Sequence, residues 1–357
     1  MSFKALLDLH RNVEQLVRGA NRKVFLSGWD VSNPFTCSFL GPLYDAEADS
    51  TAYQSYTSDE VLLDRLRRMH RRFDGQDPGP RRILPGDGST GLIASVFTWL
   101  FRQGHRRVHY VPTMHDTFYY FFELYGLEVH RASPRHPFEA GFSLDLPDER
   151  TVLFVSDPSW YVGRALSPEV VERIKAWQAR TGSLVFVDGT WQYLQWGDTR
   201  HERSSELDPD LTIRLVGPTK FLGLNGHRFS YLILPERLFG EIADVHENLH
   251  GSTSVQNLAF ARRAIEVMTT PGHNRALTDH VRGIYGALVE GGAVETEVTP
   301  DCGLYCFGRV RGDAERFLVM GGEYYELDGY PGYVRINLLS QDGVAALAGV
   351  APALAGA

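Results

Sequence analysis

Short apolar runs alternate with helical patterns through the middle of the chain. The runs lie at Val108–Val111, Thr151–Val155, Leu184–Val187, Thr212–Val216 and Phe229–Leu234. They are nearly continuously apolar, which is typical of strands covered on both faces. Because helical spacing of apolar residues recurs between them, the pattern predicts an α/β fold. Its large domain would hold a doubly wound, mainly parallel sheet with helices on both faces.

Two of the intervening helices are expected at Thr90–Phe101 and Pro168–Thr181. The second has the clearer ends, because Ser167 suits the N-cap, Pro168 the first helical position and Gly182 the residue just past the end. In a doubly wound sheet, ligands bind beyond the carboxyl ends of the strands. Residues that directly follow the predicted strands are therefore the first candidates for a functional site.

The last third of the chain has a different pattern. Helical spacing dominates Glu236–Leu249 and Ser254–Met268, and a β-containing region follows from Val294 to Leu339. We expect an N-terminal segment over residues 1–45, a large domain over 46–240 and a smaller α+β domain over 241–357. The N-terminal segment is too short to fold alone, so it would pack on the small domain or on a partner subunit.

The composition is that of a globular protein, with 43% hydrophobic and 22% charged residues. The 36 basic and 44 acidic residues give a net charge of −8, which disfavours nucleic-acid binding and membrane-surface attachment. The three cysteines, Cys37, Cys302 and Cys306, form neither a disulfide framework nor a zinc site. No apolar run reaches about 20 residues and no signal-peptide pattern is present, so we expect a soluble cytoplasmic protein.

A glycine-rich turn precedes the first predicted helix. The residues Gly88, Ser89 and Thr90 lie where the chain enters the helix at Thr90–Phe101. Glycine permits close backbone approach, and a helix N-terminus offers free N–H groups that bind phosphate. The turn could therefore hold a phosphate, although an ordinary turn would have the same sequence.

Two charged residues follow buried strands. Asp188 ends the strand at Leu184–Val187, where it could cap a helix or pair with a buried cationic ring nitrogen. Lys220 follows the strand at Thr212–Val216 in an apolar, glycine-rich stretch, and Arg228 lies eight residues further on. Burial lowers the pKa of a lysine and makes its amine available as a nucleophile. Arg228 could meet a phosphate, whereas the alternative is a surface turn with ordinary charges.

A fourth candidate is Arg335, which lies inside the short strand pattern Tyr333–Leu338. A guanidinium group suits a carboxylate because it can donate two parallel hydrogen bonds. A solvated arginine on an edge strand is the alternative.

Together these four motifs resemble the fold type I family of pyridoxal-phosphate enzymes, and specifically its class I and II aminotransferase branch. Lys220, with Gly223, Gly226 and Arg228, looks like the lysine motif that forms the Schiff base with pyridoxal 5′-phosphate. The resemblance makes the large domain the cofactor-binding one. It assigns the remaining motifs as follows: Asp188 to the pyridinium nitrogen, Gly88, Ser89 and Thr90 to the phosphate, and Arg335 to the substrate carboxylate.

The chain departs from the family at three cofactor contacts. Trp160 stands where the family has an asparagine that bonds the phenolic oxygen, and Trp191 stands where a tyrosine often reaches the same oxygen. Gly217 replaces a serine that commonly binds the phosphate. Tryptophan offers a single N–H donor and no acceptor. Cofactor binding through Asp188 and Lys220 would persist, but the fate of the carbanion formed from the substrate could change.

Two further contacts are implied by the resemblance. His115, with Phe118 next in order, is expected to stack on the cofactor ring, and Tyr56 is expected to reach the phosphate of the other subunit in a homodimer. Ordinary loop or core packing is the alternative for each. The acidic residues Asp45 and Glu47 could meet a basic substrate or simply form a solvated loop.

The expected activity is therefore that of a pyridoxal-phosphate-dependent aminotransferase, which acts on an amino acid, a small-molecule substrate, through a Schiff base on Lys220. The alternative within the same fold is a specialised enzyme of a natural-product pathway: a cyclase, an elimination or replacement enzyme, or an oxidase of an amino acid, with arginine-derived amino acids among the candidate substrates. A third alternative, from a different class, is an inactive relative that binds a ligand or partner.

Overall fold

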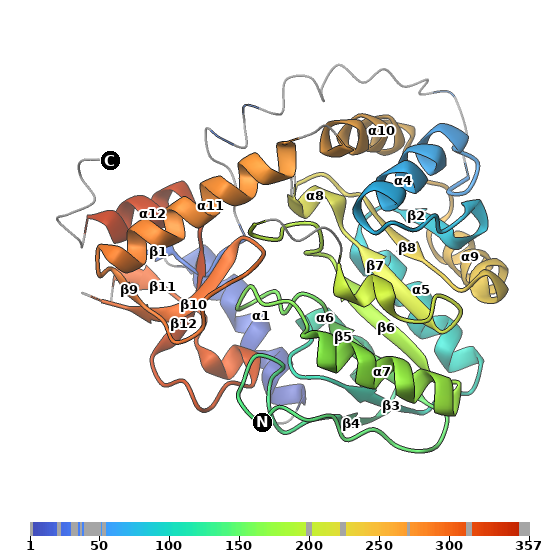
Figure 1. The fold of residues 1–357 in the computed structure, drawn as a ribbon, viewed down its shortest axis with the longest axis horizontal. Helices are drawn as coiled ribbons and strands as arrows, with labels where there is room; N and C mark the ends of the chain where they lie inside the picture. Colours follow the sequence, from blue (N-terminus) through green and yellow to red (C-terminus); the bar gives the residue numbers. More distant parts are fainter. Residues whose placement is uncertain are drawn as a thin grey trace.

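The structure is a computed structural model that describes residues 3–19, 23–29, 35, 38, 51, 55–197, 202–221, 226–269, 272–311 and 316–349. Its largest element is a seven-stranded sheet (Figure 1). In spatial order the strands are β2 (Ile83–Gly86), β8 (Ser230–Ile233), β7 (Thr212–Val216), β6 (Leu184–Gly189), β5 (Val152–Ser156), β3 (Arg107–Tyr110) and β4 (Glu128–Arg131). Strand β8 runs opposite to the other six strands, which are parallel to one another. The predicted α/β class with a mainly parallel sheet is therefore confirmed.

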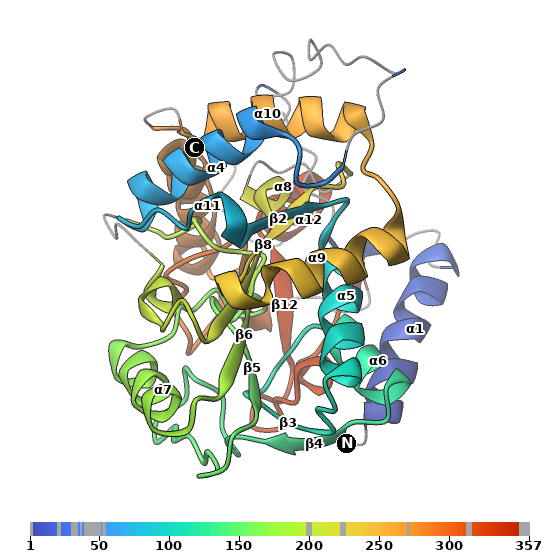
Figure 2. The ribbon, with the colours of Figure 1, turned by 90° about the vertical axis from the view of Figure 1, so that its right-hand side faces the viewer.

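Helices cover both faces of this sheet. Figure 2 shows α5 (Ser89–Arg102), α6 (Asp116–Leu124) and α9 (Glu236–His250) on one side and α7 (Pro168–Thr181) on the other. The bounds of α7 are those expected from its caps, since the Ser167 side chain accepts a hydrogen bond from the Val170 N–H and Gly182 has a φ of 64°. Aromatic side chains fill the layer between β5, β6 and the helices on the first side; Phe97 and Phe154 lie with ring centroids 5.2 Å apart.

Further helical segments surround the sheet. They are α4 (Glu60–Phe73), the 3-10 turns η1 (Pro80–Arg82) and η2 (Arg203–Glu206), the one-turn helix α8 (Pro218–Phe221) and α10 (Val255–Thr269). Helix α10 packs against α4, and α9 packs against α5. In the part of the chain that the structure describes, no helix has both the length and the apolar character of a membrane-spanning segment.

A second, smaller set of elements lies beside the large sheet (Figure 1). An antiparallel sheet holds β9 (Val294–Glu295), β10 (Tyr305–Val310) and β12 (Tyr333–Asn337), and α11 (His273–Glu290), η4 (Gly322–Tyr325) and α12 (Gln341–Ala348) accompany it. The N-terminal segment forms α1 (Phe3–Gly19) and β1 (Val24–Phe25), and β1 pairs in parallel with β11 (Phe317–Leu318). Helix α1 contacts both α6 and η4. The N-terminal segment thus reaches both sets of elements.

Candidate active site

A cavity of about 330 Å³ lies beyond the carboxyl ends of β5, β6 and β7. Elements far apart in the sequence supply its walls, including α1, the turn before α5, α8 and the small sheet. Ten of the eleven site residues expected from the sequence line it: Gly88, Ser89, Thr90, His115, Trp160, Asp188, Trp191, Lys220, Arg228 and Arg335.

Lys220 is one of the residues that line this cavity. Helix α8 begins directly after β7, so the strand fixes where the lysine enters the cavity. Its Nζ lies 5.0 Å from the ring centroid of Trp191. Burial, followed by the charges of Arg228 and Arg335, lowers the pKa of Lys220 to about 8, while Asp188 opposes the shift. A lowered pKa increases the share of neutral amine that can act as a nucleophile or proton acceptor.

Asp188 is a buried carboxylate at the end of β6. Its Oδ1 accepts hydrogen bonds from the backbone N–H of Thr190, at 3.2 Å, and from the Thr190 hydroxyl, at 2.8 Å. Its Oδ2 has no hydrogen-bond partner among the described residues, and the residue lines the cavity. Burial raises the pKa of Asp188, although the nearby His115, Thr190 and Lys220 oppose the shift. The site therefore presents one carboxylate oxygen that would gain from a cationic donor.

The turn before α5 forms a cradle whose backbone conformation favours glycine. Gly88 has a φ of 97°, and a Cβ placed on it would lie 2.7 Å from Nη2 of Arg228. No side chain caps the N-terminus of α5, so its free N–H groups remain for a ligand. Asp87, beside Gly88, accepts hydrogen bonds from Thr253 and Asn257, which anchor the turn. A guanidinium and a helix N-terminus converging on one point are suited to a phosphate.

Arg335 belongs to β12 and is 5% exposed. Its Nε and Nη2 donate hydrogen bonds to the backbone carbonyl of Ser27, at 3.2 and 2.5 Å. Aromatic rings surround its guanidinium, with centroid distances of 4.9 Å to Trp160, 4.6 Å to Tyr305 and 5.8 Å to Tyr325. The alternative of a solvated edge-strand arginine is therefore wrong.

His115 caps α6 and lies beside Trp160, with ring centroids 5.3 Å apart. Its Nδ1 lies 2.6 Å from Oδ1 of Asp116. Burial disfavours the imidazolium, but the Asp116 carboxylate outweighs that effect and raises the pKa of His115. Phe118, the second choice for the stacking residue, also lines the cavity. Which of the two would stack on a cofactor stays a prediction.

Tyr56 does not line the cavity. It is 1% exposed and packs in the core of its own chain, with its ring centroid 4.4 Å from that of His246 in α9. The hydroxyl of the neighbouring Ser55 donates a hydrogen bond to Glu247, which also holds this segment against α9. Within one chain Tyr56 is therefore packed as a core tyrosine, and its contact with the phosphate of the other subunit stays a prediction.

Other sequence expectations lie outside the described residues. They are Gly223 of the lysine motif and the acidic residues Asp45 and Glu47.

Several residues that the sequence reasoning did not single out also shape the site. Thr190 holds Asp188, and the short Asp-x-Thr pattern, in which a side chain bonds the backbone two residues on, could have indicated it. Thr190 also explains Gly217, since a Cβ at Gly217 would lie 3.1 Å from the Thr190 carbonyl oxygen. Ser27 holds Arg335 through its backbone carbonyl, which no sequence pattern could have shown.

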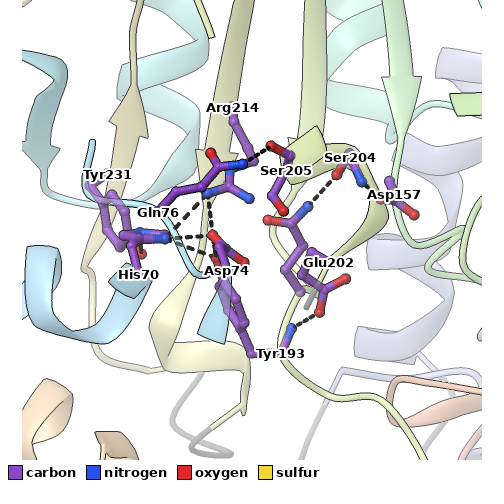
Figure 3. A network of polar contacts seen from close by, with 11 residues as sticks. His70, Asp74, Gln76, Asp157, Tyr193, Glu202, Ser204, Ser205, Arg214 and Tyr231 are labelled. Atoms are coloured by element: carbon purple, nitrogen blue, oxygen red, sulfur yellow. Dashed lines mark hydrogen bonds and ion pairs between the residues drawn. The ribbon is translucent and has the colours of Figure 1, made fainter. Parts of the chain in front are cut away.

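A buried polar network supports the loop that follows β6 (Figure 3). Asp74 lies between three donors: Arg214 Nη2 at 2.6 Å, the Tyr193 hydroxyl at 2.9 Å and His70 Nδ1 at 2.8 Å. Although burial opposes it, the charge of Arg214 holds the pKa of Asp74 well below its usual range. The Tyr193 N–H also donates to Glu202. Because Tyr193 lies two residues from Trp191, the network fixes part of the cavity wall.

Comparison with known proteins identifies the family. The family match and the fold define a pyridoxal-phosphate enzyme of fold type I. The chain belongs to the aminotransferase class I and II family, whose model matches residues 45–350. Members of this family are transferases that use pyridoxal 5′-phosphate and act on amino acids as small-molecule substrates. No curated protein matches the chain.

Solved structures share the fold at low sequence identity. The substrate-bound structure of BacF from Bacillus subtilis is 14% identical, has a TM-score of 0.78, and covers 95% of this chain and 93% of its own. A probable N-succinyldiaminopimelate aminotransferase from Thermus thermophilus is 15% identical with a TM-score of 0.76, covering 99% and 100%. YbdL from Escherichia coli, described with a methionine aminotransferase function, is 17% identical with a TM-score of 0.74, covering 97% and 94%.

Proposed function

We propose that the protein transfers the amino group of an amino acid to a keto acid, with pyridoxal 5′-phosphate joined to Lys220. The observation that carries the proposal is that Lys220, Asp188, Arg228 and Arg335 line one cavity although separate segments of the chain supply them. Each of these residues would meet a different chemical group of the cofactor or the substrate.

The side chains present fit the cofactor. The cradle at Gly88, with Arg228 against it, suits the phosphate, and the unpartnered Oδ2 of Asp188 suits a protonated ring nitrogen. The bound cofactor supplies an electron sink for a carbanion at the substrate α-carbon. Asp188 would keep the ring nitrogen protonated, because an opposite charge favours the charged form.

Lys220 and Arg335 would handle the substrate. Arg335 would bind the α-carboxylate and so orient the α-carbon relative to Lys220. Once released from the cofactor, the Lys220 amine would accept the α-proton and return it at a different carbon. A pKa of about 8 suits a group that must both take and give a proton near neutral pH.

A specialised reaction of the same carbanion is the second candidate, and one observation favours it. The indole Nε1 of Trp160 is buried and has no hydrogen-bond partner among the described residues. Position 160 therefore does not present to the cavity the donor that an asparagine would supply. With fewer donors to the phenolic oxygen, loss of a substituent, cyclisation or electron transfer to oxygen could compete with transamination.

The test is to add each of the twenty proteinogenic amino acids, and arginine-derived amino acids, to the holoenzyme. Transamination predicts a stable conversion of the cofactor spectrum to that of its aminated form, reversed by the matching keto acid. Oxygen uptake, or a product other than the keto acid, would favour the specialised reaction. Lys220→Ala should abolish either reaction, and unchanged turnover in that variant would contradict the proposal.

We also propose that the protein is a cytoplasmic homodimer. Family active sites are completed across a two-fold interface. Cys302 and Cys306 are free and buried, which is compatible with a reducing compartment. Light scattering on the purified holoenzyme should give about twice the chain mass of 40.1 kDa, and a monomer would contradict the dimer.

A further inference from the structure

We propose that Trp160 is a positioning residue for Arg335, and that the site uses its ring face rather than its N–H group. The inference rests on the proposed role of Arg335 as the receptor for the substrate carboxylate. Trp160, which stands in place of a family asparagine, would then act on the substrate-binding arginine and not on the cofactor.

The guanidinium of Arg335 is held by two kinds of contact. Hydrogen bonds from Nε and Nη2 to the Ser27 carbonyl fix one edge. The rings of Trp160 and Tyr305 lie 4.9 and 4.6 Å from its central carbon. The attraction between a cation and the face of an aromatic ring is strongest where water is excluded. Trp160 and Tyr305 are only 6% and 1% exposed, so this attraction should be strong here.

This arrangement leaves donors for a ligand. Beyond the bonds to Ser27, Arg335 Nη2 contacts the sulfur of Met320 at 3.7 Å. The Nη1 atom takes part in no hydrogen bond with the residues that the structure describes. Since Arg335 lines the cavity, a carboxylate can approach the guanidinium there. The contacts thus orient the guanidinium before substrate arrives, which lowers the entropy lost on binding.

Trp160 is itself fixed firmly enough to act as a support. The turn after β5 is closed by a hydrogen bond from the Ser159 N–H to the Arg164 carbonyl, at 2.7 Å. Tyr325 packs edge-on against the Trp160 ring, with centroids 5.6 Å apart. Because Nε1 is buried without a partner among the described residues, a donor role toward the cavity would require the ring to turn out of this packing.

The test uses Trp160→Phe, which keeps a ring, and Trp160→Leu, which removes it. Trp99→Leu is the matched control, since Trp99 is also largely buried, at 4%, but lies on α5 and does not line the cavity. The first readout is the Nε–H resonance of Arg335 in protein labelled with ¹⁵N-arginine, assigned by its loss in Arg335→Met. The second is the affinity for acetate, the simplest carboxylate, followed on that resonance. The third is the affinity for pyridoxal 5′-phosphate.

In the wild type and in Trp99→Leu, we expect ring currents to shift the Arg335 resonance away from the position of an exposed arginine. Trp160→Leu should move the resonance toward that position and weaken acetate binding about 3- to 30-fold. Trp160→Phe should retain most of the ring-current shift and most of the acetate affinity. Cofactor affinity should change less than about threefold in either variant.

Two results would overturn the inference. One is an Arg335 resonance and acetate affinity that Trp160→Leu leaves at wild-type values. The other is a loss of cofactor affinity in both Trp160 variants with Arg335 unaffected, which would assign Trp160 to the cofactor. Failure of acetate to perturb Arg335 in the wild type would instead contradict the proposed function of Arg335, and the ring-current comparison would still decide the role of Trp160.

Discussion

The pKa of Lys220 gives a quantitative prediction. The environment lowers it from 10.5 to about 8 through burial and the charges of Arg228 and Arg335. At pH 7 a pKa of 8 leaves about one amine in ten neutral, whereas a pKa of 10.5 leaves about one in 3,000. The site therefore raises the concentration of reactive amine by a factor of roughly 300.

This chain is well suited to the measurement, because it has only four lysines: Lys4, Lys23, Lys175 and Lys220. Reductive ¹³C-methylation of the apoprotein should therefore give few resonances, whose shifts report each pKa as pH is varied. Lys220 should titrate at a lower pH than Lys175, which serves as an internal reference because its hydrogen bond to Glu172 raises its pKa.

The second part of this experiment removes a nearby charge. Arg335→Met should raise the pKa of Lys220, because one of the cations that disfavour its ammonium form is gone. Arg309→Met is the control, since Arg309 also lies over a tyrosine ring on the small sheet but does not line the cavity. A Lys220 resonance that titrates near 10 in the wild type, or a lower midpoint in Arg335→Met, would refute the reasoning.

Three further predictions concern the cradle and the buried network. Gly88→Ala should weaken cofactor binding about tenfold or more, measured by equilibrium titration, because the φ of 97° is strained for alanine and the added Cβ would displace Arg228. Asp74→Asn should lower the free energy of unfolding by about 3–5 kcal/mol in urea titrations, since Arg214 would remain buried without its counter-charge; a loss below about 1 kcal/mol would contradict the network. Burial, followed by the charge of a neighbouring aspartate, raises the pKa of Glu202 from 4.5 to about 8, so the folded state holds this proton more tightly than the unfolded state. The contribution of Glu202 to the free energy of unfolding should then fall between about pH 4.5 and 8. The free energy of unfolding of Glu202→Gln, relative to that of the wild type, should rise across this window. An equal difference at both ends of the window would contradict the prediction.

The sequence predicted the parts of the fold that depend on local chemistry. The bounds of α7 followed from Ser167 and Gly182, and the central strands followed from their apolar runs. It did not predict β4, because this strand lies at the sheet edge and is mostly exposed, so it has no apolar run. It also did not predict β2, where Pro85 interrupts a short strand.

The site could be predicted where a residue follows a strand or a glycine turn, as for Asp188, Lys220 and Gly88. It could not be predicted where the partner is backbone or a distant ring. The Ser27 carbonyl that holds Arg335 lies 308 residues away in the sequence, and any residue type could have supplied it. The burial of Tyr56 likewise depends on where its segment meets α9, which no local pattern specifies.

The central claim is that the cofactor is joined to the amine of Lys220. The most direct test is to incubate the protein with pyridoxal 5′-phosphate, reduce it with borohydride and map the peptides by mass spectrometry. We predict a single phosphopyridoxyl group on Lys220, with Lys4, Lys23 and Lys175 unmodified at stoichiometric cofactor. An unmodified Lys220, or a cofactor distributed over the other three lysines, would contradict the account.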